Sequence, residues 1–455
     1  MRRTLRKLLT PLRTIVFSFT LLILTGTFLL YLPAATQTGT RIGFLTALFT
    51  ATSASCVTGL VLVDTATTWS RFGQLVILSL IQIGGLGIIT LAVFFFTLLG
   101  KKMRIKEALL VQESVNHFDF ADVAATMKKI FRMIFLVELG GALLLAIRFI
   151  PRYGPHGVFM SVFHAVSAFC NAGFDIMGDV EAPFASLTGY VGDPLVTLTI
   201  SGLVIFGGLG YLFWQDALGL RKGGRLGYHA RFVLIMTGSL LLFGTVFFLV
   251  SEFNNPATLS ALSAGEKLNA AFFQSVTPRT AGFNTLDQGS LTPISKLITI
   301  ILMFIGGGSG STAGGVKITT IGVAVVAILS QIRGKGEATA FRHRIHNTIV
   351  LKAISIIALS LMLVLGITIL VLAAEQAAGK HPPLVDILFE VGSAFGTVGL
   401  SSVATPTLTP LSHVFLLITM FLGKVGPLSF VLTLTQRGSR DSAQVVLPEG
   451  KLVVG

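Results

Sequence analysis

Three observations predict an all-α polytopic membrane protein built from four similar helix–loop–helix repeats. The 455-residue chain is 53% hydrophobic and 12% charged, with a mean hydropathy of +0.83, whereas a soluble domain carries about 25% charged residues. Apolar runs long enough to cross a bilayer follow one another along the whole sequence. Two glycine-containing markers also recur in the same order at a regular spacing, which is the signature of an internal repeat.

Eight apolar runs are the predicted transmembrane helices, because about 20 apolar residues cross the hydrocarbon core. They are Thr14–Leu32, Phe72–Leu99, Phe131–Phe149, Leu195–Trp214, Phe232–Val250, Ile294–Leu329, Ile349–Ala373 and Val414–Leu434. A shorter, semi-apolar segment lies between the two members of each pair and cannot span a bilayer. We expect these four segments to be re-entrant pore helices, each followed by a loop that is buried in protein or lines water. They are Phe44–Ser55, Val158–Phe169, Leu268–Val276 and Leu384–Phe395.

Each short segment ends in a polar string that contains a key glycine. The four strings are Cys56–Leu60, Cys170–Phe174, Arg279–Phe283 and Gly396–Leu400. The key glycines Gly59, Gly173, Gly282 and Gly399 are 114, 109 and 117 residues apart. A second glycine marker follows each string, at Ile83–Gly87, Phe206–Gly210, Gly306–Gly310 and Leu422–Gly426. The chain therefore divides into four predicted repeats, residues 1–110, 111–225, 226–345 and 346–455, the last of which includes a cytosolic C-terminal tail.

The placement of the basic residues predicts the orientation in the membrane. If the glycine strings face outward, 24 of the 34 lysines and arginines fall on the inner side and eight on the outer side. The positive-inside rule then places both termini in the cytosol. This placement explains the net charge of +14 without a nucleic-acid partner. Two cysteines are too few for a disulfide framework or a cysteine-rich metal site.

The glycine strings have the composition of an ion-selectivity filter. Backbone carbonyls that point at a common axis can replace the water around a cation, and glycine permits the backbone conformations that this requires. The fourth string contains T-V-G, the start of the potassium-channel filter T-V-G-Y-G. No string continues to Y-G, so we expect a shorter filter around a central pore. Glycine turns between packed segments are the alternative, and four equivalent strings at one period argue against it. The predicted ion-binding residues are Val57, Thr58, Gly59, Asn171, Ala172, Gly173, Thr280, Ala281, Gly282, Thr397, Val398 and Gly399.

In this layout the chain resembles the superfamily of potassium transporters that includes the Ktr, Trk and plant HKT proteins. The resemblance covers nearly the whole chain and is carried by ATSASCVTGL, AFCNAGF, SVTPRTAGFN, GSAFGTVGL and IGGGSGSTAGG. The first apolar run starts near residue 14, which leaves no room in this sequence for the extra N-terminal helix pair of Trk-type subunits. The chain is therefore most similar to the KtrB-type membrane subunits.

The resemblance implies potassium uptake across the cytoplasmic membrane of a bacterium, through one pore per chain. It implies K⁺ as the transported ion, Na⁺ as a coupling or activating ion, and no covalently bound cofactor. The implied partners are a second copy of the chain, in a homodimer, and a cytosolic nucleotide-binding ring of the KtrA type. The alternatives are a secondary carrier with a midplane site and a Na⁺-selective or Na⁺/K⁺ transporter of the same superfamily. The sequence has no H-E-x-x-H or G-x-S-x-G motif and no acid pair within the predicted spans, so we do not expect an enzyme.

A glycine-rich stretch interrupts the sixth apolar run. Gly306–Gly315 contains six glycines, and each interior glycine costs a helix about 1 kcal/mol relative to alanine. We therefore predict a non-helical loop just below the filter, and by resemblance it is the intramembrane gating loop. A nucleotide site is not expected there, because no βαβ unit surrounds the loop. The predicted gate residues are Gly306, Gly307, Gly308, Ser309, Gly310, Ser311, Thr312, Gly314, Gly315 and Lys424.

Charged residues near the filter have further predicted roles. Lys424, where the family pattern has an arginine, is expected to bond to the gating loop, with snorkelling to the cytosolic interface as the alternative. Arg279 is expected to turn away from the axis and pair with an acid, of which Glu390 is one candidate. Glu138 is expected to form an interhelical hydrogen bond. The outer acids either concentrate cations or tie their loops, and they are Asp64, Asp175 and Asp287.

Overall fold

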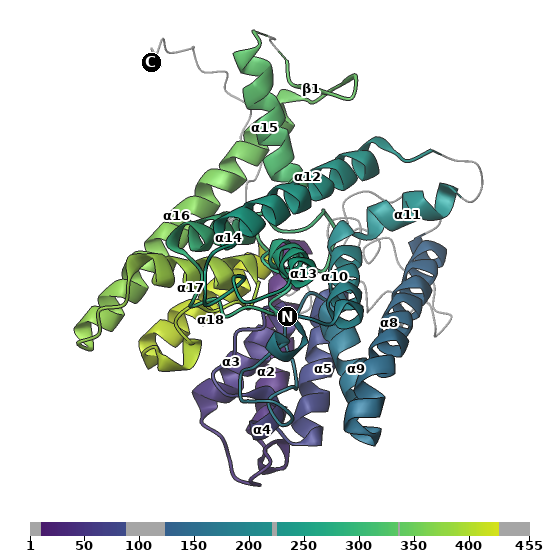
Figure 1. The fold of residues 1–455 in the computed structure, drawn as a ribbon. Helices are drawn as coiled ribbons and strands as arrows, with labels where there is room; N and C mark the ends of the chain where they lie inside the picture. Colours follow the sequence, from purple (N-terminus) through teal and green to yellow (C-terminus); the bar gives the residue numbers. More distant parts are fainter. Residues whose placement is uncertain (1–10, 88–122, 221–224, 335–336, 427–455) are drawn as a thin grey trace, which may run out of the picture.

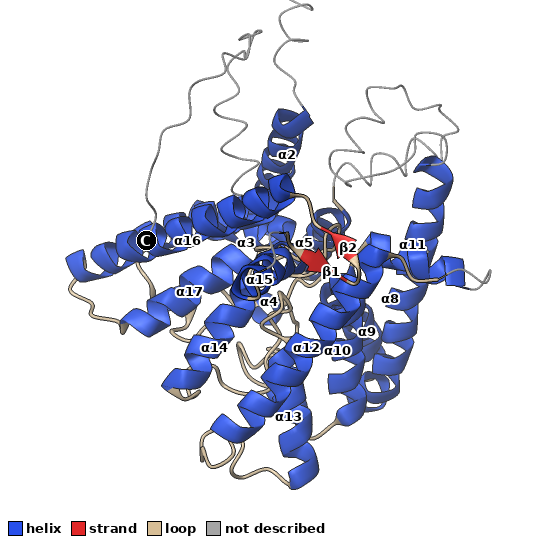
Figure 2. Ribbon diagram, turned by 90° about the horizontal axis from the view of Figure 1, so that it is seen from above, coloured by secondary structure: helices blue, strands red, loops and turns tan. Residues whose placement is uncertain are grey.

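The computed structural model of the chain describes residues 11–87, 123–220, 225–334 and 337–426, and they are mostly helical (Figure 1). The helices are α2 (Pro11–Tyr31), α3 (Phe44–Cys56), α4 (Thr65–Thr68), α5 (Arg71–Leu86), α8 (Val123–Tyr153), α9 (Pro155–Phe169), α10 (Pro194–Leu209), α11 (Tyr211–Leu220), α12 (Tyr228–Ser251), α13 (Ala264–Val276), α14 (Pro293–Phe304), α15 (Ile318–Ile332), α16 (Asn347–Ala377), α17 (Leu384–Gly396) and α18 (Pro410–Val425). Single 3₁₀ turns lie at η1 (Pro33–Ala35), η2 (Thr188–Tyr190) and η3 (Thr405–Thr407). In the described part, β1 (Thr339–Ala340) and β2 (His343–Arg344) form an antiparallel hairpin, drawn red in Figure 2. The basic N-terminal residues, the end of the second apolar run and the predicted cytosolic tail lie outside the described residues.

Four stretches of the chain share one order of elements: a first helix, a short helix that ends at a glycine string, and a third helix. We call them the first (residues 11–87), second (123–220), third (228–332) and fourth (347–426) segments. In Figure 1 their purple, blue, teal and yellow-green helices surround the centre of the molecule. The third helix of each segment packs against the short helix of the next, so the helices close into a ring. The pairs are α5 with α9, α10 with α13, α14 with α17, and α18 with α3.

Two of the expected spans are divided, one by a bend at Gly210 and one by the loop that the glycine-rich stretch predicted. Within the described residues, three helices are individually long and apolar enough to cross a membrane, in α8, α12 and α16. The helices α10 and α11 together are a further candidate, but they are bent by 95° at Gly210, which has a φ of 85°. The run Ile294–Leu329 is divided by a loop between α14 and α15. A mostly helical polytopic fold is therefore confirmed, and the number of complete spans stays a prediction.

The first helix of each segment presents apolar side chains outward. Phe17 of α2, Leu139 of α8, Leu242 of α12 and Ile369 of α16 are 64%, 56%, 69% and 66% exposed. Exposure of this extent on four separate helices is what a surface in contact with lipid requires, since single exposed apolar residues are all that a soluble surface normally carries. The short helices lie inside: most residues of α3, α9 and α17 are buried, and so is the C-terminal half of α13.

The third helices begin at local capping signals. Ser70, Asp193, Thr292 and Thr409 are the N-cap residues of α5, α10, α14 and α18, and each side chain accepts a hydrogen bond from a backbone N–H of the first turn. Proline follows the cap in the last three, where its missing N–H costs nothing. Two buried carboxylates extend the caps in the third and fourth segments. Glu252 accepts from the hydroxyl of Thr292 at 2.7 Å, and Glu375 from that of Thr409 at 2.8 Å.

Candidate functional site

Each short helix ends in the same strained backbone turn. The residue two positions before each key glycine is left-handed, with φ of 59° at Val57, 58° at Asn171, 65° at Thr280 and 51° at Thr397. The glycines themselves have φ of 91° at Gly59, 68° at Gly173, 81° at Gly282 and 97° at Gly399. Positive φ is rare for β-branched residues, and three of these four are valine or threonine. Four different sequences are thus held in one turn by the structure around them.

The four key glycines face one another around a common centre. A methyl group built on Gly282 would lie 2.3 Å from the carbonyl oxygen of Val398, in the next segment. A methyl group on Gly399 would lie 2.3 Å from the carbonyl oxygen of Thr58, which closes the circle back to the first segment. Any side chain would clash at these distances, so only glycine fits. The carbonyl oxygens that meet the glycines belong to the residues just before them: Thr58, Ala172, Ala281 and Val398.

A hydroxyl five or six positions before each key glycine fastens the turn. These residues are not among those predicted from the sequence, and they are Ser53, Ser167, Thr277 and Ser393. In the first and fourth segments the oxygen accepts from the N–H of the glycine, as Ser393 Oγ does from Gly399 at 3.0 Å. In the second and third the hydroxyl donates to the carbonyl that follows the glycine, as Ser167 does to Phe174 at 2.7 Å. The signal was present in the sequence, as a hydroxyl residue six positions before the glycine in three segments and five positions before it in the third.

Other polar atoms of the strings lie beside the ring of carbonyls. The side-chain amide of Asn171 lies 3.0 Å from Thr280 Oγ1 and joins the second segment to the third. The buried hydroxyl oxygens of Thr58 and Thr397 have no hydrogen-bond partner among the described residues. A buried polar atom in this state calls for a water molecule or an ion. The site therefore offers neutral oxygen ligands, which is the chemistry of a channel filter for monovalent cations.

Arg279 bonds to α12 and pairs with no acid among the described residues. The side chain is 7% exposed, and its Nη2 donates to the Thr237 hydroxyl on α12 at 3.4 Å. No ion pair involves Arg279 within the described part of the chain. Glu390 accepts instead from the hydroxyls of Ser401 and Thr405. The predicted pairing with Glu390 is therefore wrong, because that carboxylate holds the stretch after the fourth glycine string.

The loop between α14 and α15 packs against the glycine marker of the second segment. Residues 305–317 form no helix, which confirms the prediction from their glycine content. The N–H of Gly308 donates to the carbonyl of Gly208 at 2.8 Å, and the N–H of Tyr211 donates to the carbonyl of Gly310 at 3.2 Å. A methyl group on Gly308 would lie 2.6 Å from the Leu209 carbonyl oxygen. Glycine is thus required for backbone to approach backbone where α10 bends into α11.

The other end of the loop lies against the fourth glycine string. A methyl group on Gly314 would lie 2.2 Å from Thr397 Oγ1, one of the hydroxyls without a partner. The hydroxyl of Thr312 donates to the carbonyl of Phe169, the last residue of α9, at 3.4 Å. The loop therefore reaches from the second segment to the fourth, directly beside the ring.

Two lysines hold the loop by its backbone carbonyls. Lys424 Nζ, on α18, donates to the carbonyl of Thr312 at 2.6 Å. Lys317 Nζ donates to the carbonyl of Ala313, the next residue. The contact of Lys424 with the loop is the expected one. The two lysine side chains thus bind the carbonyl groups of two neighbouring residues in the loop beside the ring.

The glycine markers bring the third helices close to the short helices in three segments. Methyl groups on Gly84, Gly207 and Gly423 would lie 1.9, 1.9 and 2.0 Å from the carbonyl oxygens of Ser55, Phe169 and Phe395. In the third segment, a methyl group on Gly306 would lie 2.0 Å from the carbonyl oxygen of Gly314, inside its own loop. The third segment therefore uses its marker to fold the loop and not to seat a helix.

Glu138 forms the expected interhelical hydrogen bond. Gln82 Nε2 on α5 donates to Glu138 Oε1 on α8 at 3.0 Å. Cys170 Sγ lies 3.7 Å from Gln82 Oε1, and both Cys170 and Cys56 are buried, free thiols. Free cysteines in such surroundings pack as small apolar groups.

The three outer acids tie their own loops. Asp64 Oδ1 accepts from the N–H of Thr67 at 2.8 Å, and Asp175 Oδ1 accepts from that of Met177 at 3.0 Å. Asp287 Oδ1 accepts in the same way from Gly289 at 3.2 Å. The loop-tying interpretation therefore holds for all three, and their effect on cation concentration stays a prediction.

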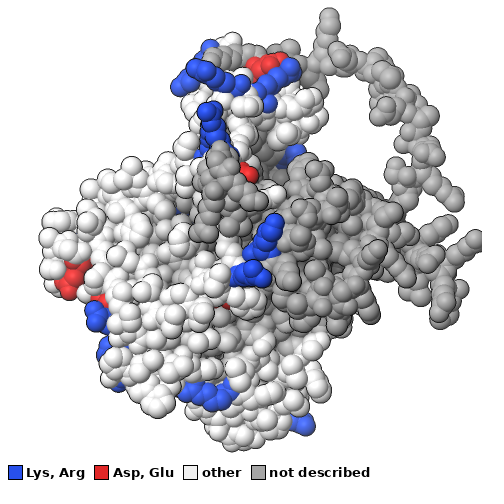
Figure 3. All heavy atoms as spheres, turned by 90° about the vertical axis from the view of Figure 1, so that its right-hand side faces the viewer, with Lys and Arg blue, Asp and Glu red and all other residues white. Residues whose placement is uncertain are grey.

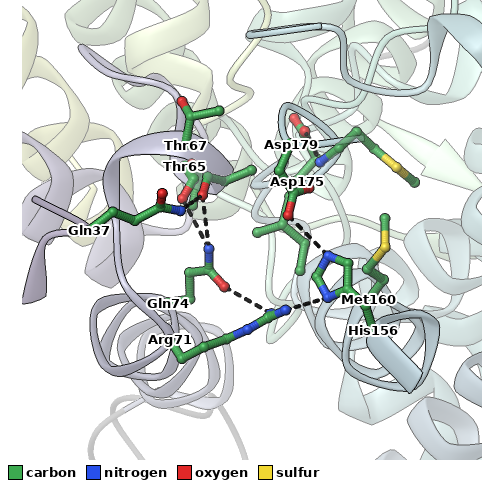
Figure 4. Close-up of polar contacts among 12 residues, drawn as sticks. Gln37, Thr65, Thr67, Arg71, Gln74, His156, Met160, Asp175 and Asp179 are labelled. Carbon is green, nitrogen blue, oxygen red and sulfur yellow. Dashed lines mark hydrogen bonds and ion pairs between the residues drawn. The ribbon is translucent and has the colours of Figure 1, made fainter. Parts of the chain in front are cut away.

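A polar network joins the first and second segments near the start of α5 and α9 (Figure 4). Arg71, the first residue of α5, donates to Gln74 Oε1 at 3.2 Å and also contacts His156 near the start of α9. His156 Nε2 lies 3.1 Å from Asp179 Oδ2, in the loop after the second glycine string, and Figure 4 places Asp175 close by. The network fixes the separation of two neighbouring segments beside the second string.

Comparison with known proteins gives the family. The model of the TrkH family, described as cation transport protein, matches residues 3–442. The Ktr system potassium uptake protein B of Bacillus subtilis is 43% identical over 452 residues, which cover 98% of this chain and 97% of that protein. The potassium/sodium uptake protein NtpJ of Enterococcus hirae is 38% identical over 100% of this chain and 99% of that protein. The Ktr system potassium uptake protein B of Vibrio alginolyticus is 36% identical over 97% of this chain and 94% of that protein.

A solved structure supports the fold. The potassium transporter TrkH from Vibrio parahaemolyticus superposes with a TM-score of 0.73 at 17% identity, covering 94% of this chain and 86% of that one. The sequence match over almost the whole chain and the shared fold agree with the resemblance to the Ktr and Trk proteins. This chain belongs to the TrkH family of cation transport proteins.

Proposed function

We propose that the chain takes up potassium ions across the cytoplasmic membrane of a bacterium through a channel-like pore with a short selectivity filter. The relatives from Bacillus subtilis and Vibrio alginolyticus are named as potassium uptake proteins, and the one from Enterococcus hirae as a potassium/sodium uptake protein. Na⁺ is accordingly the proposed coupling or activating ion. The proposed filter consists of the three residues that end at each key glycine: Val57 to Gly59, Asn171 to Gly173, Thr280 to Gly282, and Thr397 to Gly399.

The observation that carries this proposal is the ring of carbonyl oxygens. Each of four segments contributes one carbonyl, and each carbonyl meets the key glycine of a neighbour. Carbonyl rings of this kind replace the hydration shell of a cation. The partnerless hydroxyls of Thr58 and Thr397 add further oxygens beside the ring. No acid or base is needed for such transport, in keeping with a transporter and not an enzyme.

The loop Gly306–Gly315, with Lys424, is the proposed gate. It passes beside the ring between the second and fourth segments, and its glycine backbone deforms at low cost. Lys424 and Lys317 bring positive charge to the same place. Steric block and electrostatic repulsion would then act together against K⁺.

The proposed assembly is a homodimer regulated by a cytosolic nucleotide-binding ring of the KtrA type, with both termini in the cytosol. The relatives from Bacillus subtilis and Vibrio alginolyticus are named as protein B of a Ktr system, which supports the existence of a further component. Exposed basic residues of the hairpin, including Arg344, offer a docking face. The test is transport by purified chain in liposomes with and without cytosol and nucleotide. Full K⁺ transport by the chain alone, with no response to either addition, would contradict the regulatory partner.

The uptake experiment uses potassium-deficient cells that express the chain. We expect saturable uptake of radioactive potassium above the level of cells without the chain, reduced only weakly by an equal concentration of Na⁺. Uptake that Na⁺ abolishes at equal concentration would favour the Na⁺-preferring alternative. Uptake at background level, with the chain present in the membrane, would contradict the proposal that the chain takes up K⁺.

A secondary carrier is the second candidate, and one observation favours it. The bend between α10 and α11 and the break between α14 and α15 are the kind of discontinuous helices that line carrier sites. Single-chain electrical recording in planar bilayers separates the two. Unitary currents of many ions per opening would support the pore, and their absence beside measurable tracer flux would support the carrier.

A further inference from the structure

A groove lies between α12, α15 and the β hairpin, away from the ring of glycines. It encloses about 250 Å³. Its walls are mainly apolar, and they include Phe232, Ile235, Met236, Leu329 and Phe341, with Arg333 at the rim. Figure 1 shows α15 and β1 projecting from the top of the molecule, so this groove borders the surroundings and not the pore.

The hairpin that closes the groove has an unusual turn. Phe341 and Arg342 connect the paired residues Ala340 and His343, and they have φ of 47° and 64°. Two-residue hairpin turns with two positive φ values normally contain asparagine and glycine. A phenylalanine and an arginine in left-handed conformation are strained, and such strain is retained where the surroundings or the function require it. The turn places the Phe341 ring edge-on against Phe232, with centroids 6.2 Å apart.

The groove is bordered by arginines that pair with no acid in the described part of the chain. Arg333 and Arg342 are exposed and make no ion pair or side-chain hydrogen bond with the described residues, and the same is true of Arg231 on α12. Arg344 differs, because its Nη2 lies 2.8 Å from Glu337 Oε1. Figure 3 shows lysine and arginine side chains gathered around an acidic patch at the top of the molecule, with further basic groups lower on a mostly uncharged face.

Apolar surface continues from the groove along both helices. Ile235 of α12 is 53% exposed, and Ile328 and Ile332 of α15 are 58% and 76% exposed. These side chains need hydrocarbon around them, whereas the guanidinium groups at the end of α15 need water or phosphate. Apolar side chains along the helices, with arginines at the helix end and in the hairpin, are typical of the boundary between the hydrocarbon core and the head groups of a membrane. A soluble anion would use only the arginines and leave the groove empty.

We propose that this groove binds an anionic phospholipid, with the phosphate between Arg333 and Arg342 and an acyl chain along Ile235 and Leu329. Arginine is suited to this contact because its planar fork matches phosphate geometry, and basic pockets beside transmembrane helices recognise lipid head groups. The proposal adds a ligand site that is separate from the ion pathway.

The test places a fluorescent reporter in the groove. Phe341→Trp is introduced into the full chain, which is reconstituted in nanodiscs that contain brominated phosphatidylglycerol or brominated phosphatidylcholine in a non-brominated background. Emission of the parent chain, from Trp69 and Trp214, is subtracted. We expect brominated phosphatidylglycerol to quench Trp at 341 at a several-fold lower mole fraction than brominated phosphatidylcholine.

Matched variants decide the outcome. Phe243→Trp, at a 51% exposed position within α12, reports ordinary lipid contact, and both lipids should quench it equally. In the Phe341→Trp chain, Arg333→Gln with Arg342→Gln should abolish the preference, whereas Arg344→Gln should retain it because that arginine is already paired. Equal quenching by the two lipids at position 341 would overturn the proposal. Absence of quenching by both would also overturn it, since the groove would then be filled by protein.

Discussion

The ring of glycine strings and the adjoining ends of the third helices differ in how closely the four segments resemble one another. In the ring, four segments with different side chains adopt one backbone turn, and each glycine meets the carbonyl of its neighbour. In the adjoining layer the third segment departs from the rest. The helices α5, α10 and α18 end at a left-handed marker glycine, Gly87, Gly210 or Gly426, whereas α14 ends at Phe304 and a loop follows.

The ring of glycine strings and the loop beside it have different structural requirements. Ion coordination by backbone carbonyls needs the same conformation four times and is indifferent to most side chains. A gate made of a single loop requires only one segment to differ from the other three. Four equivalent loops would all have to move together for the pore to open. The structure places this single departure between the second and fourth segments, held by hydrogen bonds and by two lysines.

The largest effect is expected from a side chain in the ring. Gly282→Ser puts a methylene 2.3 Å from the Val398 carbonyl oxygen, so backbone must shift at the ion site. We expect K⁺ affinity to fall by roughly tenfold or more, which corresponds to about 1.4 kcal/mol, together with weaker discrimination against Na⁺. Uptake kinetics with K⁺ and Na⁺ in cells measure both.

The control replaces a glycine by serine in α16, the first helix of the fourth segment. Nothing lies within 4 Å of a methyl group built on Gly366 of α16, so Gly366→Ser should leave affinity unchanged. Serine is then tested at Gly59, Gly173 and Gly399 as well. Unchanged K⁺ affinity in all four ring variants would end the filter assignment.

Shortening the loop tests the departure of the third segment. Deletion of residues from 308 to 314 should raise the maximum uptake rate several-fold, because the barrier is removed, and should leave apparent K⁺ affinity nearly unchanged, because the glycine strings are intact. Rates are normalised to the amount of chain in the membrane. A lower rate at normal expression would favour a scaffold role for the loop.

Removal of one loop contact should act in the same direction but more weakly. Lys424→Ala deletes the bond to the Thr312 carbonyl, and a hydrogen bond to a charged group contributes about 1.5–3 kcal/mol. We expect a rise of roughly two- to fivefold in maximum rate, since Lys317 still holds the neighbouring carbonyl. The double variant with Lys317→Ala measures whether the two lysines are coupled. Strict additivity would contradict a shared role.

The smallest effect is expected at the hydroxyls that fasten the turns. Ser393→Ala removes the acceptor for the N–H of Gly399, and a neutral hydrogen bond contributes about 1 kcal/mol. Apparent K⁺ affinity should fall by roughly two- to threefold. Ser355→Ala is the control, because this exposed hydroxyl on α16 bonds only to the carbonyl of Leu351. An equal change in both variants would mean that the effect does not come from the turn.

Several features could be predicted because they depend on nearby residues. The short helices α3 and α17 begin where the apolar segments begin and end one residue later than predicted, at Cys56 and Gly396. The start of α13 was missed, since the helix begins with a polar turn, where Ser263 and Glu266 cap each other, and only then becomes apolar. Apolar length alone cannot locate such a start.

What the sequence by itself determined is the membrane class, the positions of the glycine strings and the loss of helix at 305–317, since composition and backbone freedom act locally. Only the tertiary structure decided which groups meet. Lys424 bonds to Thr312, which is 112 residues away, and Arg279 bonds to Thr237 and not to an acid. These partners depend on how four segments close into a ring, and a linear pattern does not contain the distances between segments.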